Sequence, residues 1–141
     1  MINIYLDTTG SMLEMGKDSA LVYIAKSIED YCNLKQLQCS FYKLDTTNIS
    51  KLESIKFSND IQLKIENIQQ KSILISDGLF DFNEDTIFDL SISIGVDADL
   101  LKLKKISKKI FDNDNVLSAL EYIIFKYDLL DSKIKEDEDE W

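Results

Sequence analysis

The stretch Ile2-Asn3-Ile4-Tyr5-Leu6-Asp7-Thr8-Thr9-Gly10-Ser11-Met12 decides the fold of this chain. An apolar run, interrupted only by Asn3, ends in a carboxylate, and three hydroxyl residues and a glycine follow it. A run that is apolar on both faces is typical of a central parallel strand covered by helices on each side. Ligands in such sheets gather beyond the carboxyl ends of the strands, so the residues after Leu6 are the first candidates for a functional site.

The side chains of Asp7, Thr9 and Ser11 fall at alternate positions of the turn that follows this strand. A hard cation such as Mg²⁺ takes oxygen ligands and keeps several waters, so one carboxylate and two hydroxyls can form a partial shell. Gly10 lets the backbone turn tightly between the last two of these residues. The pattern predicts that Mg²⁺ or Mn²⁺ binds here.

Three blocks of the sequence together resemble one known family. Asp7-Thr8-Thr9-Gly10-Ser11-Met12 resembles the Asp-x-Ser/Thr-Gly-Ser-Met form of the metal-ion-dependent adhesion site of von Willebrand factor A domains. Ile73-Leu74-Ile75-Ser76-Asp77-Gly78 resembles the second metal-site strand of that family, and the stretch 93–101 resembles its fifth strand. The resemblance runs through most of the chain and implies a doubly wound, Rossmann-like α/β fold with a mostly parallel sheet.

The same resemblance implies a function for the chain. In that family a Glu or Asp of a partner protein completes the octahedral shell of the metal ion, so the chain is expected to be a metal-dependent protein–protein interaction module. Bacterial proteins of the family are often coupled to AAA+ ATPases, which makes such an assembly the expected partner. The sequence favours bacterial origin too, because it lacks Arg, His and Pro and is rich in Ile, Lys, Asn and Asp.

The remaining metal ligands are expected from two other segments. Asp77 ends a second apolar run at the same edge, so we expect it to face Asp7, although a lone Asp-Gly is also a common turn or capping sequence. The family places a further threonine on a top loop before this aspartate, and Thr47 lies thirty residues before Asp77. Thr47 is therefore the candidate by resemblance, and the alternative hydroxyls are those of Thr46 and Ser58.

Spacing along the chain predicts the other elements. Helical spacing indicates amphipathic helices over 20–32, with Asp18 or Ser19 at its start, and over 116–130, entered through Asn113 or Asp114. Alternation indicates strands over 38–44 and 90–96, and a short outer strand at Ile110 and Phe111. Asp99 is expected to cap a helix from Leu100 towards Ser107, and a short helix is expected to start near Asn83. The segment 45–71 fits strand and helix equally, and we expect six strands at most.

Composition limits the class of protein. The length of 141 residues fits one domain, expected over 1–134, and the acidic tail 135–141 is expected to be disordered or to dock through Trp141. A net charge of −10 makes nucleic acid a poor partner. The sequence shows no apolar leader or membrane span, and Cys32 and Cys39 lack metal-site spacing, so we expect a cytoplasmic protein with reduced cysteines.

Two other classes of function compete with the binding module. Haloacid-dehalogenase-like phosphatases also place an aspartate after a strand of a doubly wound sheet, but they need Asp-x-Asp, and this chain has Thr9 at the second position. The chain also contains no histidine for base chemistry and no glycine-rich phosphate loop. Catalysis is therefore not expected, and the main alternative is a structural adaptor whose metal site is vestigial.

Overall fold

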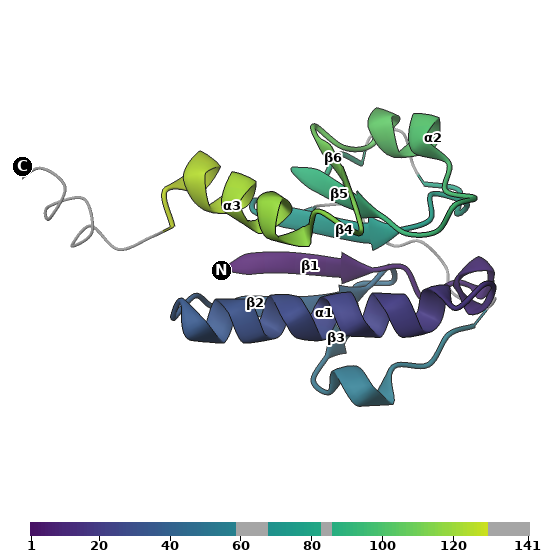
Figure 1. Cartoon of the computed structure of the whole chain (residues 1–141), viewed down its shortest axis with the longest axis horizontal. Coiled ribbons are helices and arrows are strands. Elements are labelled where there is room, and N and C mark those ends of the chain that lie inside the picture. Colours follow the sequence, from purple (N-terminus) through teal and green to yellow (C-terminus); the bar gives the residue numbers. More distant parts are fainter. Residues whose placement is uncertain (59–67, 83–85, 130–141) are drawn as a thin grey trace, which may run out of the picture.

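The computed structural model of the chain describes residues 1–58, 68–82 and 86–129. It is an α/β fold with a six-stranded sheet in the order β3-β2-β1-β4-β5-β6 (Figure 1). The described strands pair in parallel except for β2 and β3, which pair antiparallel. The strands are β1 (Ile2–Leu6), β2 (Cys39–Lys43), β3 (Asn48–Ile49), β4 (Ser72–Ser76), β5 (Leu90–Ser93) and β6 (Ile110–Asp112). The predicted doubly wound α/β class with a mostly parallel sheet is confirmed.

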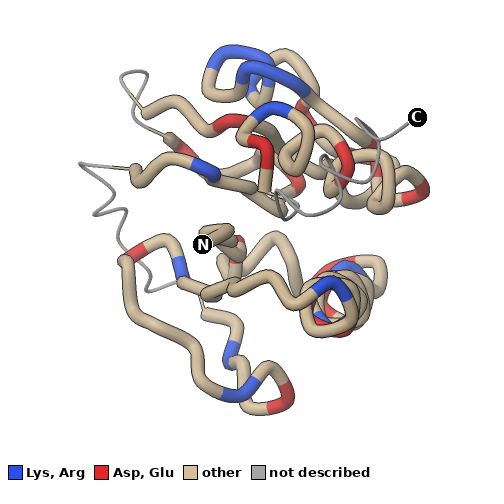
Figure 2. The backbone as a smooth tube through the Cα atoms, turned by 90° about the vertical axis from the view of Figure 1, so that its left-hand side faces the viewer, with Lys and Arg blue, Asp and Glu red and all other residues tan. Residues whose placement is uncertain are grey.

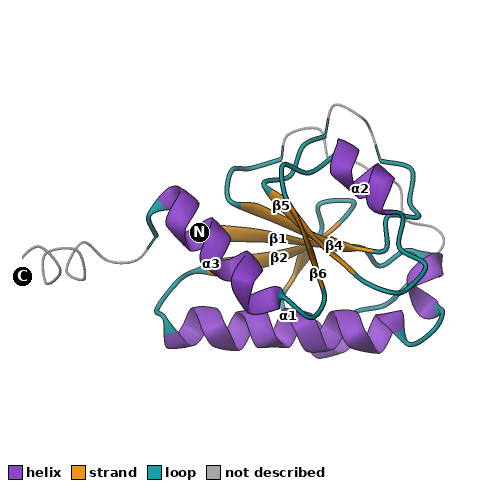
Figure 3. Cartoon of the chain, turned by 45° about the horizontal axis from the view of Figure 1, so that its top comes forward, coloured by secondary structure: helices purple, strands orange, loops and turns teal. Residues whose placement is uncertain are grey.

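Helices cover both faces of the sheet (Figure 3). The α-helices are α1 (Lys17–Leu34), α2 (Leu100–Lys105) and α3 (Val116–Tyr127), and the short 3₁₀ helices are η1 (Gly10–Leu13) and η2 (Leu52–Ser54). Apolar residues of α1 and α3 share one core cluster with one face of β1, β4 and β5. Apolar residues of α2 belong to a second cluster with the opposite face of β1 and β4. This division explains why β1 is apolar on both of its faces.

The register of the sheet brings the ends of neighbouring strands together. Leu6, the last residue of β1, pairs with Lys43 of β2 and with Ile75 of β4. Ser76 at the end of β4 pairs in turn with Ser93 at the end of β5. The loops after β1, β4 and β5 therefore lie along one edge, which we call the carboxyl edge. Functional side chains predicted on separate loops meet there.

Helix starts and ends differ in part from the predictions. Asp99 caps α2 as predicted, because its Oδ1 accepts a hydrogen bond of 3.0 Å from the amide of Lys102. The helix α1 begins without a capping side chain, after Gly16 at φ 72°, rather than at Asp18 or Ser19. Lysines fill the last turn of α2, where they complement the negative end of the helix dipole, and basic residues gather in this part of the molecule (Figure 2).

The segment after β2 forms a hairpin. Thr46, at φ 68°, stands in the tight turn that leads from β2 to the two-residue edge strand β3. The predicted strand 90–96 ends earlier, at Ser93, because the chain turns at Gly95 with φ 92°.

Three predictions lie outside the described residues: the helix start near Asn83, the domain limit at 134 and the tail 135–141. None of the helices in the described part of the chain is both long and apolar enough to cross a membrane.

Candidate functional site

The turn after β1 is built around a buried carboxylate. Asp7 has no exposed surface, and its Oδ1 accepts hydrogen bonds from the amide of Thr9 at 3.0 Å and from its hydroxyl at 2.5 Å. Ser11 follows in η1 and is partly exposed. The amide and hydroxyl of Thr9 thus fix the carboxylate, while hydroxyl oxygens of Thr9 and Ser11 keep lone pairs for another ligand. The contact between Asp7 and Thr9 is therefore shown, and the metal-ligand roles predicted for Asp7, Thr9 and Ser11 stay predictions.

The loop after β4 joins this turn through Ser76. Its hydroxyl donates a hydrogen bond of 2.6 Å to Oδ2 of Asp7 and accepts one of 2.9 Å from the amide of Gly78. Asp77 is fully buried beside them, and its Oδ1 accepts a hydrogen bond of 3.0 Å from the amide of Leu79. Asp7 and Asp77 thus lie at the same edge, each directly after one of two neighbouring parallel strands.

A buried lysine completes the polar cluster. The ammonium of Lys17, the first residue of α1, lies 2.9 Å from Oδ2 of Asp77 and 2.9 Å from Oδ2 of Asp97. The Lys17 side chain is 1% exposed, whereas that of Asp97 is 30% exposed. Burial alone would lower the pKa of Lys17, but its hydrogen bonds with Asp97 and Asp77 outweigh burial and raise that pKa. Lys17 therefore carries its charge at neutral pH.

Asp7, in contrast, has no such counter-ion in the part of the chain that the structure describes. Among the described residues, no lysine lies within ion-pair distance of its carboxylate. Burial raises the pKa of Asp7, hydrogen bonds from Ser76 and Thr9 lower it, and the charge of Asp77 raises it again, so that the pKa stands above its ordinary value. A cation beside Asp7 would remove this cost of ionisation.

The sequence Leu-Asp-Thr-Thr occurs twice, and the pKa of its aspartate depends on where in the fold each copy lies. After β1 it supplies Asp7, and after β2 it supplies Asp45, whose Oδ1 accepts a hydrogen bond of 3.0 Å from the amide of Thr47. The local hydrogen bond is the same, yet hydrogen bonds from Thr47 outweigh partial burial and lower the pKa of Asp45. Of the two copies, the one after the central strand buries its carboxylate, and no lysine of residues 1–58, 68–82 or 86–129 pairs with it.

The structure separates the candidate hydroxyls. Thr47 is exposed in the hairpin turn, and Thr46 donates its hydroxyl to the carbonyl of Asp45 at 2.6 Å. Ser58 instead lies beside the β1 turn, because its amide donates a hydrogen bond of 2.9 Å to the carbonyl of Thr8. The ligand role predicted for Thr47 stays a prediction, and of the three candidates Ser58 is the one with a described contact to the turn.

The candidate donors at and after Asp7 are oxygen atoms, the ligand type that a hard divalent cation takes. Counting only residues that the structure describes, the carboxylates of Asp7, Asp77 and Asp97 and the ammonium of Lys17 give the polar cluster a net charge of −2 when all are ionised. Within the described residues no three Asp, Glu or Cys side chains cluster in a way that could hold a metal ion. A cation here would therefore rely on Asp7, on the hydroxyls of Thr9 and Ser11, and on water, as Mg²⁺ commonly does.

Models of known protein families give no match to this chain, and the curated proteins that were searched contain no significant match. The resemblance to von Willebrand factor A domains therefore stays a prediction from the sequence.

Sequence reasoning missed two members of the cluster. Lys17 was not predicted because its partners are far away in the sequence. Asp77 follows 60 residues later and Asp97 follows 80 residues later. One signal was present, because a lysine on the first turn of a helix has the wrong sign for the helix dipole. Asp97 lies within the stretch 93–101, which resembles the family's fifth strand, but no functional role was predicted for Asp97 itself.

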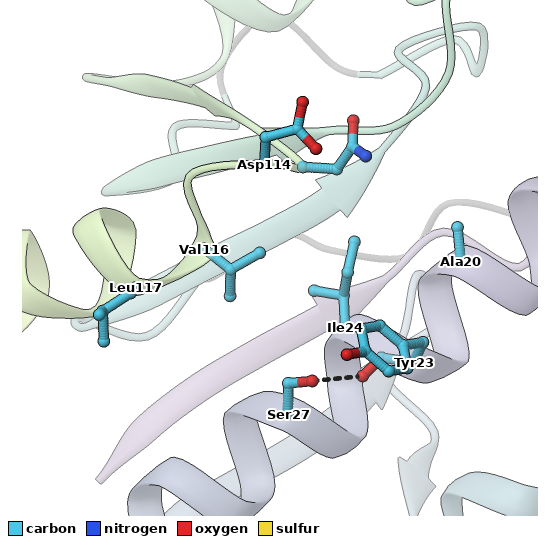
Figure 4. A pocket seen from close by; sticks show the side chains of 8 residues that line it. Ala20, Tyr23, Ile24, Ser27, Asp114, Val116 and Leu117 are labelled. Atoms are coloured by element: carbon cyan, nitrogen blue, oxygen red, sulfur yellow. Dashed lines mark hydrogen bonds between the residues drawn. The ribbon is translucent and has the colours of Figure 1, made fainter.

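A hollow lies on the face of the sheet that α1 and α3 cover. It has a volume of about 340 Å³ and is lined by Ala20, Tyr23, Ile24, Ser27, Asn113, Asp114, Val116 and Leu117 (Figure 4). The hydroxyl of Ser27 donates a hydrogen bond of 2.9 Å to the carbonyl of Tyr23. Asp114 is the one ionisable carboxylate among these residues, so no pair of acid and base converges there. The carboxyl edge carries the better candidate site.

Proposed function

We propose that this chain is a protein–protein interaction module of the von Willebrand factor A type, with Mg²⁺ or Mn²⁺ held at the carboxyl edge. Asp7, Thr9 and Ser11 hold the ion, and an acidic residue of a partner protein completes its shell. The observation that carries the proposal is the buried Asp7 carboxylate, which accepts hydrogen bonds from hydroxyls and has no cationic partner among the described residues.

Charge explains why a cation would be needed for such a partner. The chain has a net charge of −10, and the cluster at the carboxyl edge is itself negative, so an approaching carboxylate is repelled. A divalent ion held by one carboxylate and neutral hydroxyls keeps excess positive charge and an open coordination position. The cation therefore converts a repulsive edge into one that binds a carboxylate.

Exposed apolar side chains support a protein as the proposed partner. They lie in the loops and helix starts that follow β1, β4 and β5, and Val96 among them is 99% exposed. The residues are Leu13, Met15, Leu79, Val96, Leu100 and Leu101. Exposed apolar surface beside polar groups is typical of protein contact sites. The proposed partner therefore presents a Glu or Asp within an apolar surface.

The setting of the module follows from the same proposal. We place it in the bacterial cytoplasm, where a partner AAA+ ATPase assembly would be found and where the free thiols of Cys32 and Cys39 remain reduced. We assign a binding rather than a catalytic role, because Thr9 occupies the position at which a phosphatase of this topology needs its second carboxylate. A structural adaptor with a vestigial metal site is the alternative, and the ion pair between Lys17 and Asp77 favours it, since that pair neutralises one carboxylate without metal.

Calorimetric titration of the full chain with Mg²⁺ tests the proposal. Asp7→Asn removes the charge while keeping the shape of the side chain, and Asp45→Asn makes the same change in the second Leu-Asp-Thr-Thr sequence. We expect the wild type and Asp45→Asn to bind Mg²⁺ and Asp7→Asn not to bind, with all three folded by circular dichroism. Equal binding by the two variants would place the cation elsewhere, and absence of binding in the wild type would favour the adaptor.

The partner half of the proposal needs a second experiment. Affinity capture from cells that express the chain is compared with and without chelator, for the wild type and for Asp7→Asn. A partner recovered by the wild type only when divalent ions are present, and not by Asp7→Asn, supports the module. A partner recovered equally by both proteins in chelator contradicts metal-dependent recognition.

A further inference from the structure

Lys17 occupies a position that is costly for a cation. It is the first residue of an 18-residue helix, where the helix dipole disfavours positive charge, and its side chain is almost completely removed from water. Both costs are offset by carboxylates that come from two other loops of the carboxyl edge. A lysine that acted only at the surface would not need to be buried. The buried contact between Lys17, Asp77 and Asp97 therefore depends on the positive charge of Lys17.

The backbone around Lys17 is shaped to admit it. Gly95, in the loop after β5, stands at φ 92°, and a Cβ atom there would lie 2.7 Å from Cδ of Lys17 and 2.7 Å from Oδ1 of Asp97. A side chain at position 95 would thus collide with the lysine stem and with its partner. The loop after β5 both supplies the partly exposed carboxylate of Asp97 and leaves the space through which Lys17 reaches Asp77.

The consequence falls on Asp77. Its Oδ2 lies 2.9 Å from the ammonium of Lys17, and its Oδ1 accepts the amide of Leu79 at 3.0 Å. Hydrogen bonds alone do not set Asp77 apart, because both oxygens of Asp7 also accept them and each carboxylate oxygen keeps a further lone pair. The difference is the ammonium: a divalent ion bound to Asp77 would lie next to Lys17 and be repelled by it.

We infer that Lys17 is the permanent counter-ion of Asp77, so that a divalent cation at the carboxyl edge is bound by the β1 turn alone. This inference rests on the proposed function. Lys17 and Asp97 are positioning residues, which hold Asp77 and the loops after β4 and β5 in place. Asp77 contributes hydrogen bonds and structure to the edge but neither a direct nor a water-mediated bond to the ion.

The double variant Lys17→Met/Asp77→Asn tests the inference because it removes the pair as a unit. It deletes one positive and one negative charge, so the net charge of the cluster stays the same, and neutral replacement of a buried ion pair is often tolerated. We expect its Kd for Mg²⁺ in calorimetry to stay within about threefold of the wild type, as for groups that do not share the ligand shell. Asp7→Asn, the control, abolishes binding.

The outcomes separate the inference from the proposed function. If the folded double variant loses about tenfold or more in affinity, as removal of an outer-shell ligand typically does, while the wild type binds, Asp77 serves the ion and the inference is wrong. If the wild type itself does not bind Mg²⁺, the proposed function fails and the inference fails with it.

A measurement on the wild type covers the case in which the double variant does not fold. The ¹⁵Nζ resonance of the Lys17 ammonium, assigned by its absence in Lys17→Arg, is followed by NMR during a Mg²⁺ titration. Binding to the β1 turn leaves this resonance close to its initial shift, because the ion pair with Asp77 persists. Loss of the resonance, or a shift to that of a solvated lysine, as Mg²⁺ saturates the protein would overturn the inference.

Discussion

The hydroxyl of Ser76 donates a hydrogen bond of 2.6 Å to Oδ2 of Asp7 and so joins the ends of β4 and β1. Ser76 also accepts a hydrogen bond from the amide of Gly78, so the loop after β4 is connected through one hydroxyl to the carboxylate after β1. The direction of the Asp7 carboxylate therefore depends on a residue of the neighbouring strand. An ion bound by Asp7 would depend on Ser76 in the same way.

Ser76→Ala should weaken Mg²⁺ binding without abolishing it. Loss of a hydrogen bond that orients a metal ligand typically costs about 10-fold to 100-fold in affinity, and calorimetry measures the change. Ser93→Ala is the matched control, because Ser93 is the register partner of Ser76 on β5. Equal affinities in the two variants would mean that Ser76 does not orient the ligand.

Lys17→Met should lower the free energy of unfolding strongly in the absence of metal. It leaves the buried Asp77 without its counter-ion, and breaking a buried ion pair on one side typically costs about 3 to 5 kcal/mol. Lys26→Met is the control on the same helix, because the pair between Lys26 and Glu53 is exposed and such pairs contribute about 0 to 1 kcal/mol. Urea denaturation compares the two, and similar losses would contradict the role given to Lys17.

Gly95→Ala should destabilise the protein more than Gly16→Ala does. Both glycines have positive φ, so both substitutions introduce backbone strain, but a Cβ at position 16 meets nothing within 4 Å. At position 95 the added atom also collides with Lys17 and Asp97, and overpacking of this kind typically costs about 1 to 3 kcal/mol. Thermal and urea unfolding measure the difference, and an equal loss in both variants would show that the space beside Lys17 is not tight.

Stability should fall on acidification partly through Asp89. This buried carboxylate accepts hydrogen bonds of 2.9 Å from the Lys126 ammonium and 2.8 Å from the Tyr127 hydroxyl. Burial raises the pKa of Asp89, but these hydrogen bonds and that of the Ser72 amide outweigh burial and lower it. The unfolded pKa of Asp is about 3.9, so the stabilisation is present above that pH and is lost as pH falls through the lower folded pKa.

Asp89→Asn isolates this contribution. The variant should be less stable than the wild type at pH 7. The difference in the free energy of unfolding should narrow as pH falls below about 4, where Asp89 of the unfolded wild type becomes protonated, and close once pH has fallen through the lower folded pKa. Urea denaturation at a series of pH values measures the gap. A gap that stays constant from neutral to acidic pH would mean that Asp89 stabilises by packing rather than by charge.

Much of the fold could be predicted because the signals were local. The apolar runs of β1 and β4 predicted buried parallel strands, and the place of Asp99 before an apolar turn predicted the cap of α2; both predictions are confirmed. The hairpin from β2 to β3 was not predicted, because β3 has two residues and too few positions to show alternation. For the same reason, the sequence did not predict the structure of the segment around Thr47.

The candidate site was predictable where it lies within one turn and not where it depends on the whole fold. Asp7, Thr9 and Ser11 lie within five positions, so their spacing already indicates shared geometry. The pairing of Lys17 with Asp77 requires the packing of α1 against the loop after β4, and no local pattern specifies that contact. The burial that makes Asp7 differ from Asp45 is likewise a property of the central strand and not of the shared Leu-Asp-Thr-Thr sequence.

The most direct test of the central claim is a crystal structure of the full chain grown with Mn²⁺, with anomalous difference density used to locate the ion. The claim predicts one strong peak at the carboxyl edge, about 2.0 to 2.3 Å from the hydroxyl oxygens of Thr9 and Ser11, with Asp7 bound directly or through water. A well-ordered edge without a peak, or a peak that is held by other residues while Asp7 keeps only its hydrogen bonds, would contradict it.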